Sequence, residues 1–363
     1  MARELTRREY LERVAGAVVA SAWGGTVRAA DAPKPLRGAL MILNTPFTAG
    51  GDVDWDDLVN EARFVDARGA HGVVWPQGSS GVTTLTRQER LHGMELLAKT
   101  CRTLGVACVL GVQGKDTAEM LEYARFAETL APDAFISMPP TTGKSPDDYR
   151  EYFRALAGVT TRPVIQQTSG GAPGLPLPTD VIFDMARKFP HLGYVKEESD
   201  PVVARMRQEL AERAIMKGIF GASFATGWLF EMRMGLDGVI TGEAMYSDLL
   251  GRLWTMHEQG RHEEVRDGYS KYLLMRNLNE QIPGVDLYVV PDKAGRPAFI
   301  FRGADRSGAP VTPRAEAATA AGWVRQRRLT TGQARPCPPR GPAGSRSARG
   351  TCRRCWRSSG SGS

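Results

Sequence analysis

One lysine closes an apolar stretch of the chain. Lys196 directly follows the run 192–195, which reads Leu-Gly-Tyr-Val. A lysine at the end of a buried strand must pair with a carboxylate or lose its charge. A desolvated lysine is a nucleophilic amine that can form a Schiff base with a carbonyl group. Two interpretations stay open from the residues alone: a Schiff-base nucleophile, or a salt bridge to Glu197 or Glu198.

Other polar and glycine residues also follow short apolar runs. If those runs are parallel strands, their carboxyl ends meet at one edge, where such side chains can surround a small ligand. The expected substrate-binding residues are Thr45, Ser79, Ser80, Gln167, Thr168 and Gly242, and the expected catalytic residues are Lys196 and Glu243.

Eight strand–helix units must position these residues. We expect strands at 39–43, 72–75, 106–111, 134–138, 163–167, 193–196, 215–220 and 238–241. We expect helices at 55–67, 87–101, 117–130, 147–156, 179–189, 202–212, 224–234, 247–259 and 262–279. Alternation of this kind predicts an α/β fold, specifically a (β/α)8 TIM barrel with C-terminal helices. No GxGxxG or Walker phosphate loop is present, which disfavours a nucleotide-binding fold.

The motifs resemble one family. They are Thr-Pro-Phe at 45–47, Gly-Ser-Ser-Gly at 78–81, Glu-Arg at 89–90, Tyr-Val-Lys-Glu-Glu-Ser at 194–199 and Gly-Val-Ile-Thr-Gly-Glu-Ala at 238–244. Together they resemble the dihydrodipicolinate synthase / N-acetylneuraminate lyase family of class I aldolase barrels over about 38–280. The resemblance implies that Lys196 is the Schiff-base lysine for a 2-keto acid such as pyruvate. It also implies that Ser79 and Ser80 hold the keto-acid carboxylate and relay protons, and that the protein is a homo-oligomer, typically a homotetramer.

Several positions depart from the family pattern. Gln167 stands where the family carries its acid/base tyrosine, and 139–141 read Pro-Pro-Thr where the family has Pro-Tyr-Tyr. Val82 replaces a family glutamate, and no arginine follows the fifth strand. Another group must therefore move protons. Glu197 and Glu243 are the candidates, and Glu243 is preferred because Glu197 should point to the other face of its strand.

We therefore predict a Schiff-base-forming lyase or aldolase acting on a 2-keto acid such as pyruvate, by carbon–carbon or carbon–oxygen chemistry. The alternative is a catalytically impaired barrel that binds a small organic acid. No cluster of His, Cys and Asp has metal-ligand spacing, so we expect no metal and no other cofactor.

The two ends differ in composition from the body. The full chain has 363 residues and a net charge of +7. Residues 317–363 hold ten arginines and no acidic residue, whereas 33–316 hold 32 basic and 36 acidic residues. The net positive charge of the chain therefore comes from the tail, and we expect no nucleic-acid partner for the body. A tail that tethers nucleic acid is a weaker alternative.

We expect four regions. Residues 1–32 resemble a twin-arginine signal peptide, with Thr-Arg-Arg-Glu-Tyr-Leu at 6–11 followed by a short apolar run. Residues 33–245 form the barrel, 246–300 a C-terminal helical region, and 301–363 a disordered tail rich in Arg, Pro and Gly. The expected location is periplasmic or secreted, with no membrane partner in the mature form. The alternative is a cytoplasmic protein with an amphipathic N-terminal helix.

Overall fold

Eight parallel strands close into a barrel in the computed structural model, which describes residues 33–48, 51–242, 244–280, 286–291 and 297–302. The strands are β1 (Gly38–Ile42), β2 (Gly72–Trp75), β3 (Ala107–Gly111), β4 (Ala134–Ser137), β5 (Val164–Gln167), β6 (Tyr194–Lys196), β7 (Gly218–Gly221) and β8 (Gly238–Thr241). Each strand pairs with its neighbour in sequence, and β8 pairs with β1. The predicted TIM barrel is confirmed.

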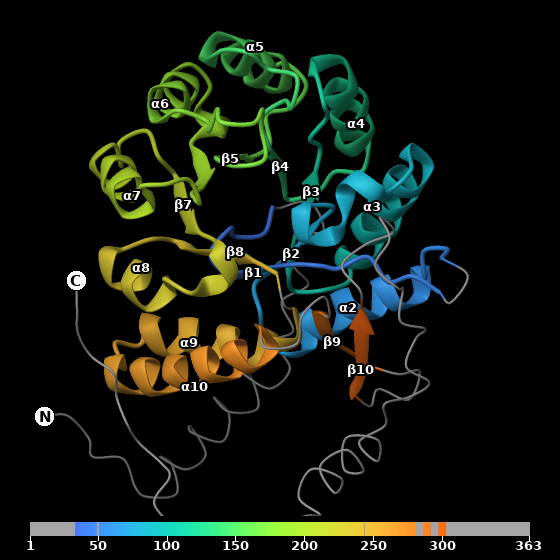
Figure 1. Cartoon of the computed structure of the whole chain (residues 1–363), viewed down its shortest axis with the longest axis vertical. Coiled ribbons are helices and arrows are strands. Elements are labelled where there is room, and N and C mark those ends of the chain that lie inside the picture. The colour runs from blue at the N-terminus through green and yellow to red at the C-terminus, as the bar shows by residue number, and fades with distance from the viewer. Residues whose placement is uncertain (1–32, 49–50, 243, 281–285, 292–296, 303–363) are drawn as a thin grey trace, which may run out of the picture. The chain divides into compact units, whose positions relative to one another are not determined.

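Helices follow the strands and surround them (Figure 1). They are α2 (Trp55–Ala67), α3 (Arg87–Cys101), α4 (Thr117–Thr129), α5 (Pro146–Ala157), α6 (Thr179–Lys188), α7 (Val202–Ala211), α8 (Trp228–Met234), α9 (Ser247–Glu258) and α10 (His262–Glu280). Side-chain caps fix several starts: Asp54 accepts from the Asp57 N–H at 3.1 Å, and Asp116 accepts from the Glu119 N–H at 2.9 Å.

Two apolar layers result from the alternation of side chains along each strand. The larger layer packs between strands and helices and includes Trp75, Phe153 and Trp254. The smaller fills the barrel interior. Its buried members are Leu40, Ile42, Val74, Val109, Ala134, Ile136, Ile165, Phe220 and Ile240. A side chain two residues beyond an interior residue therefore points to the barrel's carboxyl-end opening.

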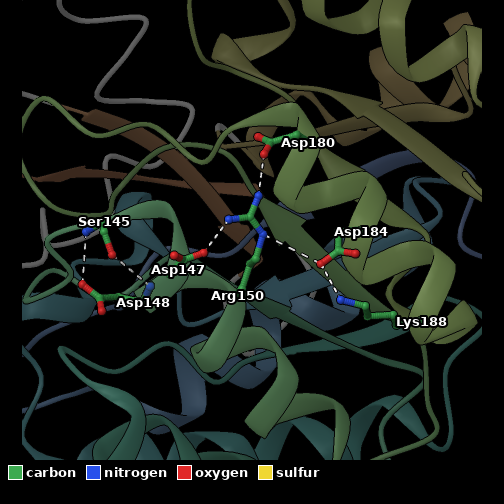
Figure 2. A network of polar contacts seen from close by, with 7 residues as sticks. All are labelled: Ser145, Asp147, Asp148, Arg150, Asp180, Asp184 and Lys188. Carbon is green, nitrogen blue, oxygen red and sulfur yellow. Dashed lines mark hydrogen bonds and ion pairs between the residues drawn. The ribbon is translucent and has the colours of Figure 1, made fainter.

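An ion network joins the outer faces of α5 and α6 (Figure 2). The Arg150 guanidinium contacts Asp147 of its own helix at 2.7 Å and also Asp180 and Asp184 of α6. Lys188 continues the network to Asp184 at 2.9 Å. Ion pairs near the surface contribute about 0–1 kcal/mol each, so this network adds little to the stability of the barrel.

Two sequence predictions of helix were wrong. The expected helix 224–234 begins only at Trp228, because Ser223, Phe224 and Ala225 adopt left-handed backbone angles. The expected helical region 246–300 is helical only to Glu280. It continues as an antiparallel pair of strands, β9 (Asp286–Pro291) and β10 (Pro297–Arg302). Aromatic and β-branched residues dominate those two segments, which favours strands over helix.

The predicted signal peptide, residues 1–32, lies outside the described residues, as does the predicted tail from residue 303 onward. None of the helices within the described ranges is long and apolar enough to cross a bilayer.

Candidate active site

Lys196 ends β6 on the interior side of the barrel. Tyr194, two residues earlier, packs against the interior apolar cluster, so the alternation of the strand turns Lys196 the same way. The residue paired with Lys196 on the neighbouring strand is Gln167, which ends β5. Lys196 is 5% exposed. A buried amine and an amide thus lie side by side at the carboxyl end of the strands, where barrels of this type carry their active sites.

Glu198 is the carboxylate that faces this amine. Its Oε2 lies 3.1 Å from Nζ of Lys196. Its Oε1 accepts a hydrogen bond from Nε2 of Gln167 at 2.7 Å and another from the Ser169 hydroxyl. The Glu198 side chain is 17% exposed. Of the two salt bridges considered from the sequence, the one to Glu198 forms, and it draws Gln167 and Ser169 into one polar cluster.

Glu197 points to the opposite side of β6, as the alternation of the strand predicted. It is fully buried and accepts hydrogen bonds from the Thr168 hydroxyl at 2.8 Å and the Ser199 N–H at 2.7 Å. Nε of Arg205, on α7, lies 2.9 Å from its other oxygen. Glu197 therefore anchors the chain behind Lys196 and is not a proton carrier in the barrel opening.

Thr168 belongs to the same anchor. It is fully buried, and its hydroxyl accepts from the Glu198 N–H at 2.9 Å while donating to Glu197. We expected Thr168 to contact substrate. The structure instead surrounds its hydroxyl with protein groups, so it fixes where Glu198 leaves the strand.

Glu209 of α7 completes the cluster behind β6. Burial, followed by the neighbouring Glu197 carboxylate, raises the pKa of Glu209 well above its usual value. Neither carboxyl oxygen of Glu209 has a hydrogen-bond donor among the described residues. A proton on Glu209 allows it to donate a hydrogen bond to Glu197. The proton leaves one negative charge on the pair, which Arg205 compensates.

Ser80 and Thr45 brace the loop after β2 against the end of β1. The Ser80 hydroxyl donates to the Leu43 carbonyl at 2.5 Å and accepts from the Gln77 N–H at 3.0 Å. The Thr45 hydroxyl donates to the Ser80 carbonyl at 2.6 Å and accepts from Nε1 of Trp75 at 3.0 Å. Both hydroxyl protons are committed to backbone carbonyls, which gives these two residues a positioning role.

Ser79 is the exposed serine of the pair, and the structure brings it close to Gly242 after β8. A Cβ placed on Gly242 would lie 3.3 Å from Oγ of Ser79 and 3.4 Å from the ring of Phe224. Ser79 thus lies exposed on the β2 side of the opening, opposite β6 in the closed order of strands. Glu243, the preferred proton carrier from sequence, lies outside the described residues.

The turn after β7 is strained, and α10 holds it. Ser223, Phe224 and Ala225 have φ angles of 51°, 53° and 56°, a region that costs about 1–3 kcal/mol for each non-glycine residue. The Tyr269 hydroxyl donates to the Ala225 carbonyl at 2.9 Å, and the Tyr272 hydroxyl donates to the Phe224 carbonyl. The C-terminal helix thereby sets the position of the Phe224 ring beside Gly242.

Sequence reasoning named Glu198 only as a possible salt-bridge partner of Lys196, and it did not single out Ser169 as a member of the site. The rule that placed Glu197 on the far face of β6 also places Glu198 on the Lys196 face, so the signal was available. Within the described residues, no group of three or more His, Cys, Asp or Glu side chains is arranged to hold a metal ion.

The chain is a closed (β/α)8 barrel with a buried lysine at the carboxyl end of its sixth strand. Enzymes with this fold carry their active sites at that end of the barrel. Residues 35–278 match the Dihydrodipicolinate synthetase family, and the chain belongs to this family. Membership supports, in general terms, an aldolase-type function of the Schiff-base kind.

Relatives agree with this assignment. The 4-hydroxy-tetrahydrodipicolinate synthase of Chlorobium phaeobacteroides is 27% identical over 247 residues, which cover 67% of this chain and 82% of the relative. The enzyme of the same name from Chlorobium luteolum is 28% identical over 257 residues, covering 68% of this chain and 83% of the relative.

Solved structures share the fold. A dihydrodipicolinate synthase from Agrobacterium tumefaciens superimposes with a TM-score of 0.60 at 20% identity, covering 68% of this chain and 84% of the other. The chloride-inhibited enzyme from Acinetobacter baumannii, solved in complex with pyruvate, gives a TM-score of 0.62 at 17% identity, covering 69% and 85%.

Proposed function

We propose that this protein is a Schiff-base lyase that acts on a 2-keto acid such as pyruvate, with Lys196 as the nucleophile. The observation that carries the proposal is the buried amine of Lys196 at the carboxyl end of β6, in a barrel of this family. The Lys196 Nζ attacks the keto carbon, and loss of water leaves an iminium ion. That cation withdraws electrons from the neighbouring carbon, so a carbon–carbon or carbon–oxygen bond there can form or break.

The opposite side of the opening is the proposed site for the substrate carboxylate. Ser79 is exposed there, and Gly242 allows the chain after β8 to lie close to its hydroxyl. The backbone of this loop is held by the buried hydroxyls of Ser80 and Thr45. A site held by internal hydrogen bonds is organised before the substrate arrives, which reduces the entropy lost on binding.

We propose that the proton-transfer steps differ from those of the resembled family, because Gln167 stands where that family carries its acid/base tyrosine. Gln167 has no proton to transfer at neutral pH, because an amide neither ionises nor acts as a useful base. The proposal is therefore restricted to Schiff-base chemistry on a 2-keto acid and does not extend to the complete reaction for which the relatives are named.

Borohydride trapping tests the proposal. The protein is mixed with pyruvate, reduced with borohydride, and weighed by intact mass spectrometry. We expect one carboxyethyl group per chain. Lys196→Met should abolish the adduct, while the matched variant Lys188→Met, on the exposed face of α6, should retain it. An adduct that persists in Lys196→Met would refute the assignment.

A second function is a barrel that binds a small organic acid without catalysis. The ion pair between Lys196 and Glu198 favours it, because an ammonium that stays paired with a carboxylate does not attack a carbonyl. Saturable pyruvate binding by calorimetry with no borohydride adduct would establish this function.

We also propose that the mature protein is exported by the twin-arginine route, on the motif at 6–11. Fractionation of cells that express the full chain tests this. Replacing Arg7 and Arg8 by lysine should shift the protein from the periplasmic or secreted fraction to the cytoplasm, and an unchanged distribution would refute export by this route.

A further inference from the structure

Glu198 is held from several directions against the Lys196 amine. Its two oxygens have different partners. Oε2 lies 3.1 Å from the Lys196 Nζ, while Oε1 accepts hydrogen bonds from Gln167 and Ser169. Its own N–H donates to the Thr168 hydroxyl at 2.9 Å. These contacts orient one oxygen of the carboxylate toward Lys196, which is the preorganisation that proton transfer requires.

Gln167 explains why the carboxylate stays in place. Its Nε2 donates to Glu198 at 2.7 Å, and its buried Oε1 has no hydrogen-bond partner among the described residues. The same Nε2 also donates to the Ser169 hydroxyl at 3.3 Å, so the amide links both groups of this cluster and contributes to orienting the carboxylate. The strand position that carries a proton-transferring tyrosine in the resembled family thus carries a residue that positions a different acid.

We propose that Glu198 is the acid/base residue of the reaction at Lys196, an inference that rests on the proposed function. Glu198 takes a proton from the Lys196 ammonium, and the neutral amine attacks the keto carbon to give a carbinolamine. Glu198 returns the proton to the departing hydroxyl, which leaves as water, and the product is an iminium ion facing a carboxylate.

The same carboxylate then acts on carbon. Glu198 removes a proton from the carbon next to the iminium, and the released electron pair forms an enamine. When the enamine bonds to an acceptor carbonyl, the protonated Glu198 gives its proton to the new alkoxide. After this proton transfer Glu198 is again a carboxylate, and water then hydrolyses the remaining iminium ion, which releases the product and restores the Lys196 amine.

Two rates test the inference. One is the rate of adduct formation under borohydride trapping, and the other is the exchange of pyruvate C3 protons for deuterium, followed by NMR. We expect Glu198→Gln to lower both by about 10²-fold or more. Glu198→Asp should recover part of the loss. The control Glu122→Gln, an exposed carboxylate on α4, should behave as the wild type.

Gln167→Met keeps Lys196, Glu198 and Ser169 and removes one of the two side-chain donors to Oε1 of Glu198, so it serves if Glu198→Gln does not fold. We expect it to slow deuterium exchange about tenfold. Wild-type exchange rates in either folded variant would overturn the role of Glu198 while leaving the lyase proposal intact. A wild-type protein that forms no adduct at all would instead refute the proposed function itself.

Discussion

Glu231 of α8 carries a carboxyl group whose protonation should control the stability of the barrel. The residue is 6% exposed, and its carboxyl group lies behind the end of β7 in space left by Gly221 and Gly227. Its Oε2 has no hydrogen-bond partner among the described residues. Burial raises the pKa of Glu231 from 4.5 to about 7. The folded state therefore binds a proton that the unfolded state has already released above about pH 5.

The size of the effect follows from that rise. Each pKa unit corresponds to about 1.4 kcal/mol, so ionising Glu231 in the folded protein lowers the free energy of unfolding by up to about 3 kcal/mol. The loss occurs as the pH rises from the unfolded pKa through the folded pKa. Glu231→Gln removes the titrating group and keeps its shape. It should be close to wild type at about pH 5 and up to about 3 kcal/mol more stable at about pH 8.

Urea unfolding at both pH values measures this. Other groups also titrate over the range, so the informative quantity is the difference between variant and wild type at each pH. The reasoning is refuted if that difference is the same at both pH values.

Three further predictions concern the elements behind β6 and β7. Arg205→Met leaves the buried Glu197 carboxylate without its cation and should cost about 3–5 kcal/mol in urea unfolding; a loss below about 1 kcal/mol would contradict the anchor described above. Glu209→Gln supplies a permanent donor to Glu197. The stability of this variant relative to the wild type should therefore increase as the pH rises. A difference that does not change with pH would argue against a protonated Glu209. Gly221→Ala places a Cβ 1.9 Å from Oε2 of Glu231. Thermal unfolding should show a free energy of unfolding lower by about 1–3 kcal/mol, and adding Glu231→Ala should restore part of it. A Gly221→Ala protein as stable as the wild type would exclude this close packing.

The barrel could be predicted from sequence because each strand is a short apolar run and each helix has a polar face. The expected strand 238–241 and helix 55–67 match β8 and α2 at both ends. The turn after β7 could not be predicted from the sequence. Residues with left-handed backbone angles are usually glycine or asparagine, whereas this turn reads Ser-Phe-Ala. Its conformation depends on hydroxyls of α10, some forty residues later in the chain.

The site was predictable in part for a similar reason. Lys196 stands out because a charge at the end of an apolar run is rare, and its buried position is confirmed. The roles of Ser80 and Thr168 depend on which backbone groups their hydroxyls meet, which no local pattern specifies. The role of Glu198 depends on both kinds of information. The alternation of side chains along β6 predicts that it faces the same way as Lys196, whereas its hydrogen bond from Gln167 depends on the pairing of β6 with β5.

Peptide mapping of the borohydride-reduced protein tests the central claim most directly. After reduction in the presence of pyruvate and digestion, tandem mass spectrometry should place a single carboxyethyl group on the side chain of Lys196. A modification spread over exposed lysines, or absent from Lys196 while pyruvate binds, would contradict the account of this barrel as a Schiff-base lyase.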